Sequence, residues 1–314
     1  MTPQQKIYAL FAGVFVVLLV ATLIGRVLAR RATGDAQQET MRNLNDRIDA
    51  WWAMIAIFAA SFLLGRAATL VLFALASFYT LREFVSLTPT RPTDNLSLIG
   101  AFYVLLPLQY ILIGMDWYGM FSILVPVYGF LLIPILAALA GDVNDFLLRV
   151  ARVQWALMLT VYSISHAPAL TTLTIPGYEG QGFLLLFFLI TVVQFSDVAQ
   201  YVSGKLFGRR KIAPSISPSK TLEGLVGGGA AATLLGAALF WITPFNPFQA
   251  GAMAAVIVAM GFLGGLSLSA VKRSMGVKDW GHSVKGHGGV LDRMDSVCFS
   301  APVFFHLTRY FFAA

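Results

Sequence analysis

The stretch FLLLFFLITVVQFSDVAQY, Phe183 to Tyr201, decides the fold class. It is about as long as the roughly 20 residues that cross the hydrocarbon core of a bilayer, so it predicts a membrane-spanning helix. Its one charged residue is Asp197. A carboxylate inside a span costs several kcal/mol unless it is paired or wet, which makes Asp197 a candidate functional residue. A structural hydrogen bond to a neighbouring helix is the alternative role.

Similar apolar runs recur along the whole 314-residue chain, of which 58% is hydrophobic and only 12% charged. A soluble protein of this composition would have too little polar surface to stay in solution. The runs are 7–29, 51–64, 67–81, 96–113, 118–140, 153–170, 181–201, 222–243, 248–268 and 292–313. We therefore predict an all-α fold, a polytopic integral membrane helical bundle with nine or ten transmembrane helices. The count stays open because 51–64 and 67–81 are short, and Gly65-Arg66 between them suggests a re-entrant pair or one broken helix.

The connections between the runs differ sharply in charge. With ten spans, one side holds 17 of the 22 lysines and arginines, in the connections 30–50, 82–95, 141–152, 202–221 and 269–291. The opposite connections 114–117, 171–180 and 244–247 hold none. By the positive-inside rule we expect the basic side to face the cytoplasm of a bacterial-type inner membrane. Because this rule explains the net charge of +7, we predict no nucleic-acid partner.

Acidic residues with possible chemical roles concentrate in the second half of the chain. Five of the fifteen lie in or beside the basic connections 202–221 and 269–291: Asp197, Glu223, Asp279, Asp292 and Asp295. We interpret the other ten as ordinary loop or span-end residues. The sequence therefore predicts two regions, an N-terminal lipid-embedded scaffold of transmembrane helices over 1–175 and a catalytic transmembrane region over 176–314.

Asp292 and Asp295 are three residues apart, so on a helix both carboxylates share a face. Two adjacent carboxylates repel each other unless a cation lies between them, and oxygen-only ligands suit magnesium. The first turn of a helix also favours acids, and for this pair alone that alternative stays open. Zinc fits poorly, because the spacing of His282 and His287 without a second cysteine does not define a zinc site.

Basic and glycine residues supply the other half of a possible site. The basic residues of the two connections are Lys205, Arg209, Arg210, Lys211 and Lys220, followed by Lys272, Arg273, Lys278 and Lys285. Some of them set topology or contact anionic lipid. Gly286, Gly288 and Gly289 bracket His287 and let backbone amides approach an anion. Carboxylates, lysines and glycines together favour a polyphosphate site for phosphoryl or nucleotidyl transfer. GLVGGG at 224–229 lacks the lysine of a Walker motif and is more typical of close helix packing.

The segment SAVKRSMGVKDWGHSVKGHGGVLDRMD, residues 269–295, resembles the signature of the phosphatidate cytidylyltransferases, S-x-x-K-R-x4-K-D-x-G followed by H-G-G-x-x-D-R-x-D. SDVAQYVSGKLFGRRK (196–211) and ISPSKTLEG (216–224) are similar to the family's second block. The resemblance covers roughly 180–313. Val284-Lys285 replaces a common Ile-Pro, Ser219 a lysine and Leu222 a tryptophan, which indicates a divergent branch.

The resemblance implies that the protein transfers a cytidylyl group from CTP to phosphatidic acid, giving CDP-diacylglycerol and pyrophosphate. It implies Mg2+ as cofactor, with room for a second cation, and a location among membrane lipids. The implied metal ligands are Asp279, Asp292 and Asp295, with Asp197 next, and these first three act in catalysis with Lys278 and His287. The implied substrate contacts are Ser217, Lys220, Lys205, Lys272, Arg273, Arg293, Gly288 and Gly289.

Other readings stay open at this point. A CTP-dependent enzyme of the same superfamily could act on another membrane lipid, and an inactive relative would carry similar motifs. An ion-coupled transporter using Asp197 is a third class, but we find no internal repeat of the kind that transporters show. The small residues of 224–236 could support a homodimer. Arg293 could clamp a lipid phosphate or form a salt bridge to Asp292.

Overall fold

The computed structural model describes residues 2–31, 34–283 and 288–313. The helices of the first half are α1 Pro3–Arg31, α2 Asp35–Leu63, α3 Arg66–Leu87, η1 Pro92–Asp94, α4 Asn95–Ile99, η2 Gly100–Leu105, α5 Leu106–Gly114, α6 Tyr118–Ile123, η3 Leu124–Gly129, α7 Phe130–Leu139, α8 Phe146–Ala156, η4 Leu157–Ser163, α9 Ile164–Ala169 and η5 Leu170–Thr172. The second half has α10 Gly182–Phe207, β1 Lys211–Ala213, β2 Ser217–Thr221, α11 Leu222–Ala238, η6 Leu239–Ile242, α12 Pro247–Ser274 and α13 Leu291–Phe312.

The chain is an integral multi-pass membrane protein with an all-α fold, as predicted. Within the described residues, eight continuous helical segments are long and apolar enough to cross a membrane. The two other predicted runs, 51–64 and 292–313, fall in α2 and α13. The suggestion of a re-entrant pair or one broken helix at 51–81 is wrong. Two separate helices of 29 and 22 residues meet there, because Gly65 adopts φ +88°, a left-handed conformation that favours glycine and reverses the chain.

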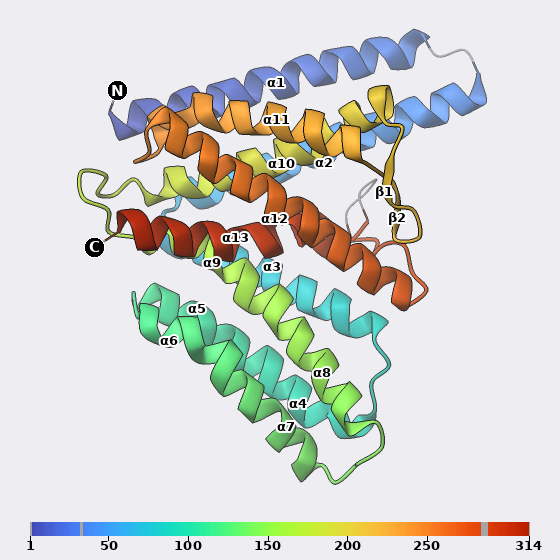
Figure 1. Ribbon diagram of the computed structural model, residues 1–314, viewed down its shortest axis with the longest axis vertical. Helices are drawn as coiled ribbons and strands as arrows, with labels where there is room; N and C mark the ends of the chain where they lie inside the picture. Colours follow the sequence, from blue (N-terminus) through green and yellow to red (C-terminus); the bar gives the residue numbers. More distant parts are fainter. Residues whose placement is uncertain (1, 32–33, 284–287, 314) are drawn as a thin grey trace.

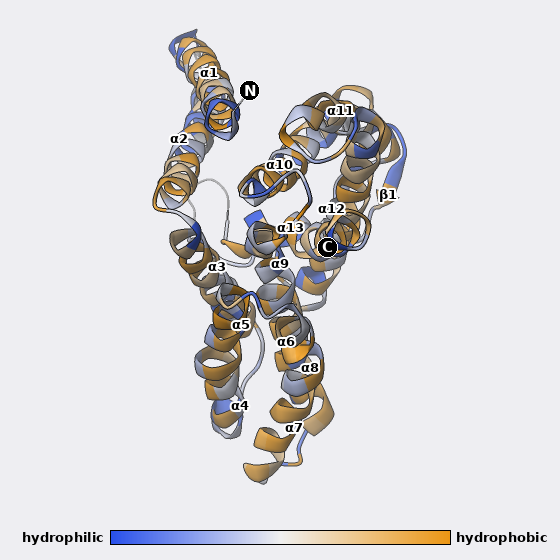
Figure 2. Cartoon of the chain, turned by 90° about the vertical axis from the view of Figure 1, so that its left-hand side faces the viewer, coloured by the Kyte–Doolittle hydropathy of each residue, from blue (hydrophilic) through white to orange (hydrophobic). Residues whose placement is uncertain are grey.

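The helices form two packed groups with a hairpin beside them. In Figure 1 the α10–α13 group lies above the group of α3–α9, α1 runs along the upper edge, and α2 passes behind α10 and α11. Contacts of α13 with both α12 and α9 show that it joins the two groups. Figure 2 shows mainly apolar residues along α4 to α8 and polar residues at β1. The fold thus places α13, which carries the predicted acids, at the centre of the molecule.

The glycine run of α11 serves close packing, as the sequence indicated. A Cβ atom on Gly228 would collide with the backbone of Gln200 in α10, and one on Gly236 would collide with Ala254 in α12. This face of α11 is therefore occupied within the chain. A homodimer stays a prediction, and these buried glycines do not supply its contact surface.

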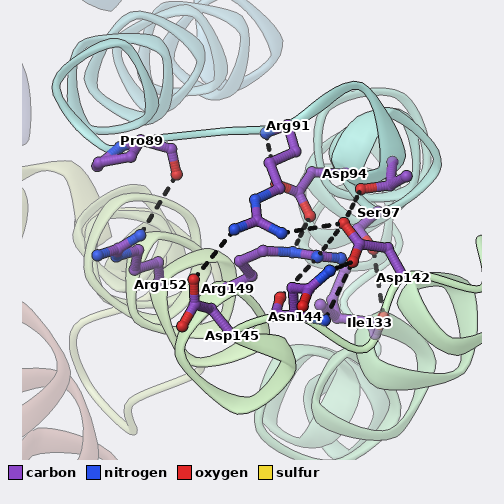
Figure 3. Close-up of polar contacts among 11 residues, drawn as sticks. Pro89, Arg91, Asp94, Ser97, Ile133, Asp142, Asn144, Asp145, Arg149 and Arg152 are labelled. Atoms are coloured by element: carbon purple, nitrogen blue, oxygen red, sulfur yellow. Dashed lines mark hydrogen bonds and ion pairs between the residues drawn. The ribbon is translucent and has the colours of Figure 1, made fainter.

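A buried ion-pair network closes one end of the α3–α9 group (Figure 3). The Arg149 side chain is 3% exposed and contacts Asp94 at 2.8 Å and Asp142 at 2.7 Å. Arg91 reaches Asp142 at 3.3 Å and Asp145 at 3.1 Å. Three carboxylates thus contact these two guanidinium groups, and the network joins the start of α4 to the α7–α8 connection and to α8.

The described parts of the five basic connections share one end of the molecule, on the right in Figure 1, whereas the labelled N and C ends of the chain lie on the left. One of these connections contains a structure that we did not predict. β1 and β2 form an antiparallel hairpin in which Lys211 pairs with Thr221 and Ala213 with Ser217. The hairpin connects α10 to α11 and brings Lys220 toward α12, where its amine contacts Phe262.

Candidate functional site

The motif loop lies between α12 and α13, and its described residues, 275–283 and 288–290, fold back on the start of α13. Asp292 in the first turn of α13 accepts hydrogen bonds at Oδ2 from the backbone amides of Trp280 (2.8 Å) and Gly289 (2.9 Å). Its Oδ1 lies 2.6 Å from Nζ of Lys272, and both side chains are nearly buried. One carboxylate thus holds both arms of the loop and a cation of α12.

Gly288 lies between two predicted acids. It has φ +82°, and a Cβ atom there would be 2.8 Å from Asp292 Oδ2 and 3.4 Å from Asp279 Cβ. The absence of a side chain at Gly288 therefore leaves room for the Asp292 carboxylate on one side and for the Cβ atom of Asp279 on the other. Asp279 itself is exposed.

Asp197 and Asp295 form a second acidic pair, joined by Ser296. Both carboxylate oxygens of Asp197 accept from Ser296 Oγ at 3.1 Å, and Asp295 Oδ1 accepts from the Ser296 amide at 2.7 Å. Asp197 lies ten residues before the end of α10 at Phe207, a depth of roughly 15 Å along the helix. Asp197 thus makes a hydrogen bond to a neighbouring helix, which was the structural alternative to a functional role. It also lies near a second carboxylate, that of Asp295.

Two cations accompany this second pair. Lys220 donates from Nζ to the carbonyl oxygen of Phe262 at 3.2 Å and lies 4.5 Å from the centre of that ring. A Cβ atom on Gly265 would be 2.9 Å from Lys220 Nζ and 3.8 Å from Asp295 Oδ2, so the amine and the carboxylate face the same point. Burial lowers the pKa of Lys220, and the nearby carboxylates oppose this shift. Nε of Arg293 is buried without a partner among the described residues.

The remaining predicted residues lie around these two pairs. Lys205 is exposed near the end of α10, and Ser217 lies in β2. Arg273 is exposed and donates from Nε to the Ile216 carbonyl at 3.3 Å, tying the β-hairpin to α12. Lys278 is exposed in the motif loop. His287 lies outside the described residues, as do Lys285 and Gly286.

Of the two roles left open for Arg293, the salt bridge to Asp292 is not formed in the described structure, where Lys272 pairs with Asp292 instead. Lys272 is the only cation within ion-pair distance of that carboxylate among the described residues. The competing role for Arg293, a phosphate contact, stays a prediction.

Sequence reasoning missed Glu83 of α3, which we had grouped with the ordinary loop and span-end acids. Glu83 is only 7% exposed. It accepts hydrogen bonds from Ser283 Oγ and from the amides of Val290 and Leu291. Its partners lie about 200 residues away in sequence, and no local pattern around Glu83 indicates them.

These side chains suit a magnesium ion that is bound partly by protein carboxylates and partly by substrate phosphates. No three acidic, histidine or cysteine side chains converge into a ligand cluster among the described residues. The acids instead form two pairs by position: Asp279 and Asp292 flank Gly288, and Asp197 and Asp295 both hydrogen-bond to Ser296. Magnesium commonly takes one or two protein carboxylates and completes its shell with water and substrate phosphates, so each pair matches its chemistry.

The chain is similar to several known proteins. The chain is 39% identical over 302 residues to the uncharacterized protein YnbB of Escherichia coli, covering 95% of this chain and 97% of that protein. It is 39% identical over 139 residues to the phosphatidate cytidylyltransferase of Haemophilus influenzae, which is 42% of this chain and 47% of that enzyme. The enzyme of the same name from Staphylococcus aureus COL is 39% identical over 127 residues, 40% of this chain and 48% of the enzyme. The chain thus matches about half the length of these two enzymes.

The match to a family model extends well beyond the acidic motif. The model of the cytidylyltransferase family covers residues 45–311, from α2 to the last turn of α13. The matched region includes both acidic pairs, Lys272 and Glu83. This multi-pass membrane protein, with its acids and lysines gathered at one end of the bundle, belongs to the cytidylyltransferase family.

Proposed function

We propose that the protein transfers a cytidylyl group from CTP to phosphatidic acid, giving CDP-diacylglycerol and pyrophosphate. The observation that carries the proposal is the position of two carboxylate pairs beside Lys220 and Lys272 in a cytidylyltransferase-family chain. Relatives named phosphatidate cytidylyltransferase support the choice of acceptor. A phosphate oxygen of the lipid attacks the α-phosphorus of CTP, and the bond from that phosphorus to the α,β-bridging oxygen breaks. Pyrophosphate leaves with the bond's electron pair.

The reaction brings two anions together, so the protein has to lower their repulsion. In our proposal Lys220 and Arg293 contact phosphate oxygens near the Asp197–Asp295 pair. Buried Arg293 Nε has no hydrogen-bond partner within the described part of the chain, which supports such a contact. Exposed Lys278 and Arg273 would attract the nucleotide to the loop. We keep His287 and Lys205 as predicted contacts.

We assign Mg2+ to the two carboxylate pairs, with one pair available for a second cation. Asp292 already accepts three hydrogen bonds, so its first role is to hold Lys272 and the motif loop. Asp295 and Asp197, which accept fewer bonds, are the stronger candidates for ligands. A bound magnesium ion would offset phosphate charge and stabilise the pyrophosphate leaving group.

The proposed substrates fit the placement of the site. CTP is water-soluble, and the motif loop lies at the end of the bundle that carries the basic connections, which we assign to the cytoplasm. Beside Asp197, α10 exposes Val198 and Tyr201, at 53% and 58%. An apolar surface next to the acids supports approach of a lipid substrate from the bilayer.

The test uses purified protein in lipid nanodiscs with phosphatidic acid, Mg2+ and CTP labelled at either the α- or the γ-phosphate. We expect a chloroform-soluble product labelled from α-labelled CTP only, and none with Asp295→Asn. The surface variant Asp145→Asn serves as the matched control and should retain activity. Label from γ-labelled CTP would indicate a lipid kinase and overturn the proposal. Label that appears only with a lipid alcohol or another phospholipid would overturn the choice of phosphatidic acid.

A further inference from the structure

Glu83 joins the N-terminal half of the chain to the motif loop. Its Oε1 accepts from Ser283 Oγ at 2.8 Å and from the Val290 amide at 2.9 Å, and its Oε2 accepts from the Leu291 amide at 2.8 Å. A buried carboxylate needs a cation or several donors to offset its lost hydration. Here three donors from one loop serve that purpose, so Glu83 and the loop depend on each other.

The amides that Glu83 accepts from belong to the start of α13. The first amides of a helix have no partner within the helix, and a carboxylate placed there satisfies them and interacts favourably with the helix dipole. Glu83 therefore fixes where α13 begins at Leu291. Because Asp292 is the next residue and Asp295 lies one turn later, the same contact sets the direction of both acids.

Two glycines leave room for the Glu83 carboxylate beside the loop. A Cβ atom on Gly289 would lie 2.5 Å from Glu83 Oε2, and one on Gly281 would lie 3.1 Å from Oε1. The next residue of α3, Phe84, stacks on Trp280 at 5.1 Å between ring centres. The Trp280 amide in turn donates to Asp292. Two adjacent residues of α3 thus hold both arms of the motif loop.

We propose that Glu83 is a positioning residue for cytidylyl transfer, an inference that rests on the proposed function. It contacts neither substrate nor the reacting atoms. It acts through the loop amides and the first turn of α13, which place Asp292 and Asp295. The first half of the chain is then more than a lipid-embedded scaffold, because α3 completes the site of the second half.

The test compares wild type with Glu83→Gln, which keeps the size of the side chain but turns an N–H donor toward a backbone donor. Glu39→Gln, an exposed glutamate of α2, removes the same charge as a control. Hydrogen exchange of the 288–295 segment, followed by mass spectrometry in magnesium-free nanodiscs, reports loop anchoring without any reaction. We expect exchange of the Val290 and Leu291 amides on the order of tenfold faster in Glu83→Gln, from the typical free energy of a helix cap.

The activity measurements use the labelled-CTP assay. We expect kcat to fall on the order of tenfold and the Mg2+ concentration for half-maximal rate to rise, while Glu39→Gln matches wild type. A lower folded fraction alone would leave the Mg2+ dependence unchanged. Unchanged exchange in Glu83→Gln, or faster exchange with full kcat and unchanged Mg2+ dependence, would overturn the positioning role.

Gly289→Ala gives an independent variant should Glu83→Gln fail to fold. Its methyl group pushes the loop away from Glu83 while keeping the carboxylate, so it should reproduce both effects. Full protection and full activity in Gly289→Ala would overturn the inference. Wild-type protein that makes no labelled lipid overturns the proposed function and with it the catalytic part of this inference. The exchange data then still decide, separately, whether Glu83 anchors the loop.

Discussion

Removing the Asp292 carboxylate should destabilise the fold as well as abolish activity. Asp292 and Lys272 are 6% and 10% exposed at their side chains, and their charged atoms are 2.6 Å apart. Asp292→Ala leaves a buried ammonium without a counter-charge and two loop amides without an acceptor. Breaking a buried pair from one side costs about 3–5 kcal/mol, so we expect a loss of that size in the free energy of unfolding.

Removing the partner charge, in Lys272→Met, should cost less free energy of unfolding than Asp292→Ala. Lys272→Met removes the charge but keeps most of the buried stem, and the Asp292 carboxylate retains the amides of Trp280 and Gly289. In the double variant the ammonium is absent, so the loss should be smaller than the sum of the single losses by about 1–3 kcal/mol. Activity should not return, because the proposed phosphate contact and the anchor of the loop are both missing.

SDS titration of each variant in mixed micelles, followed by tryptophan fluorescence, measures the free energy of unfolding. The exposed pair of Arg91 and Asp145 is the control, with side chains 40% and 63% exposed. Asp145→Asn, which suits the left-handed backbone of Asp145 (φ +49°), should cost no more than about 1 kcal/mol. Strictly additive losses at Lys272 and Asp292, or a loss at Asp292 as small as at Asp145, would refute the reasoning about this buried pair.

Three further predictions test the packing and the ion pairs. Trp280→Ala should cost about 3–5 kcal/mol in unfolding free energy, because the ring is 1% exposed and stacks on Phe84; a near-neutral effect would contradict loop docking on α3. Gly228→Val should prevent folding, seen as aggregation in size-exclusion chromatography, while Gly13→Ala, with open space at its Cβ position, should behave as wild type. Hydrogen bonds, chiefly from the Asn144 amide, hold the pKa of Asp142 below its ordinary value; its stabilising contribution should therefore be complete above about pH 4 and decline as pH falls further. Thermal unfolding of Asp142→Asn should lack this acid-dependent component.

The sequence predicted the helices well because membrane spans depend on local composition. Each apolar run corresponds to a helix, and the glycines of 224–229 pack helices as expected. The number of spans at 51–81 was uncertain because α2 begins in a polar segment that hydropathy alone does not recognise as part of a long helix. The β-hairpin was missed because SPSKT, with its proline, shows no alternation of apolar and polar residues.

The candidate site was predictable in its residue types but not in its pairings. Helical spacing correctly indicated that Asp292 and Asp295 both lie near the start of α13, yet they take different partners. Asp292 turns to Lys272 and the motif loop, whereas Asp295 turns to Ser296 and Asp197. Such differences depend on contacts between distant helices. The sequence around each residue carries no signal for them.

The acids of the site differ in how fully their charges are offset, and this difference separates structural acids from candidate ligand-binding acids. Glu83 and Asp292 have their charges offset by loop donors and by Lys272, so they act as parts of the framework. The pair of Asp197 and Asp295 shares one serine, and Nε of nearby Arg293 lacks a partner among the residues that the structure describes. Incompletely satisfied groups gain the most from a ligand, because they lose little on binding and end with stronger partners. In our proposal the cation and the phosphates therefore bind at Asp197 and Asp295, while the Glu83–Asp292 framework holds that pair in place.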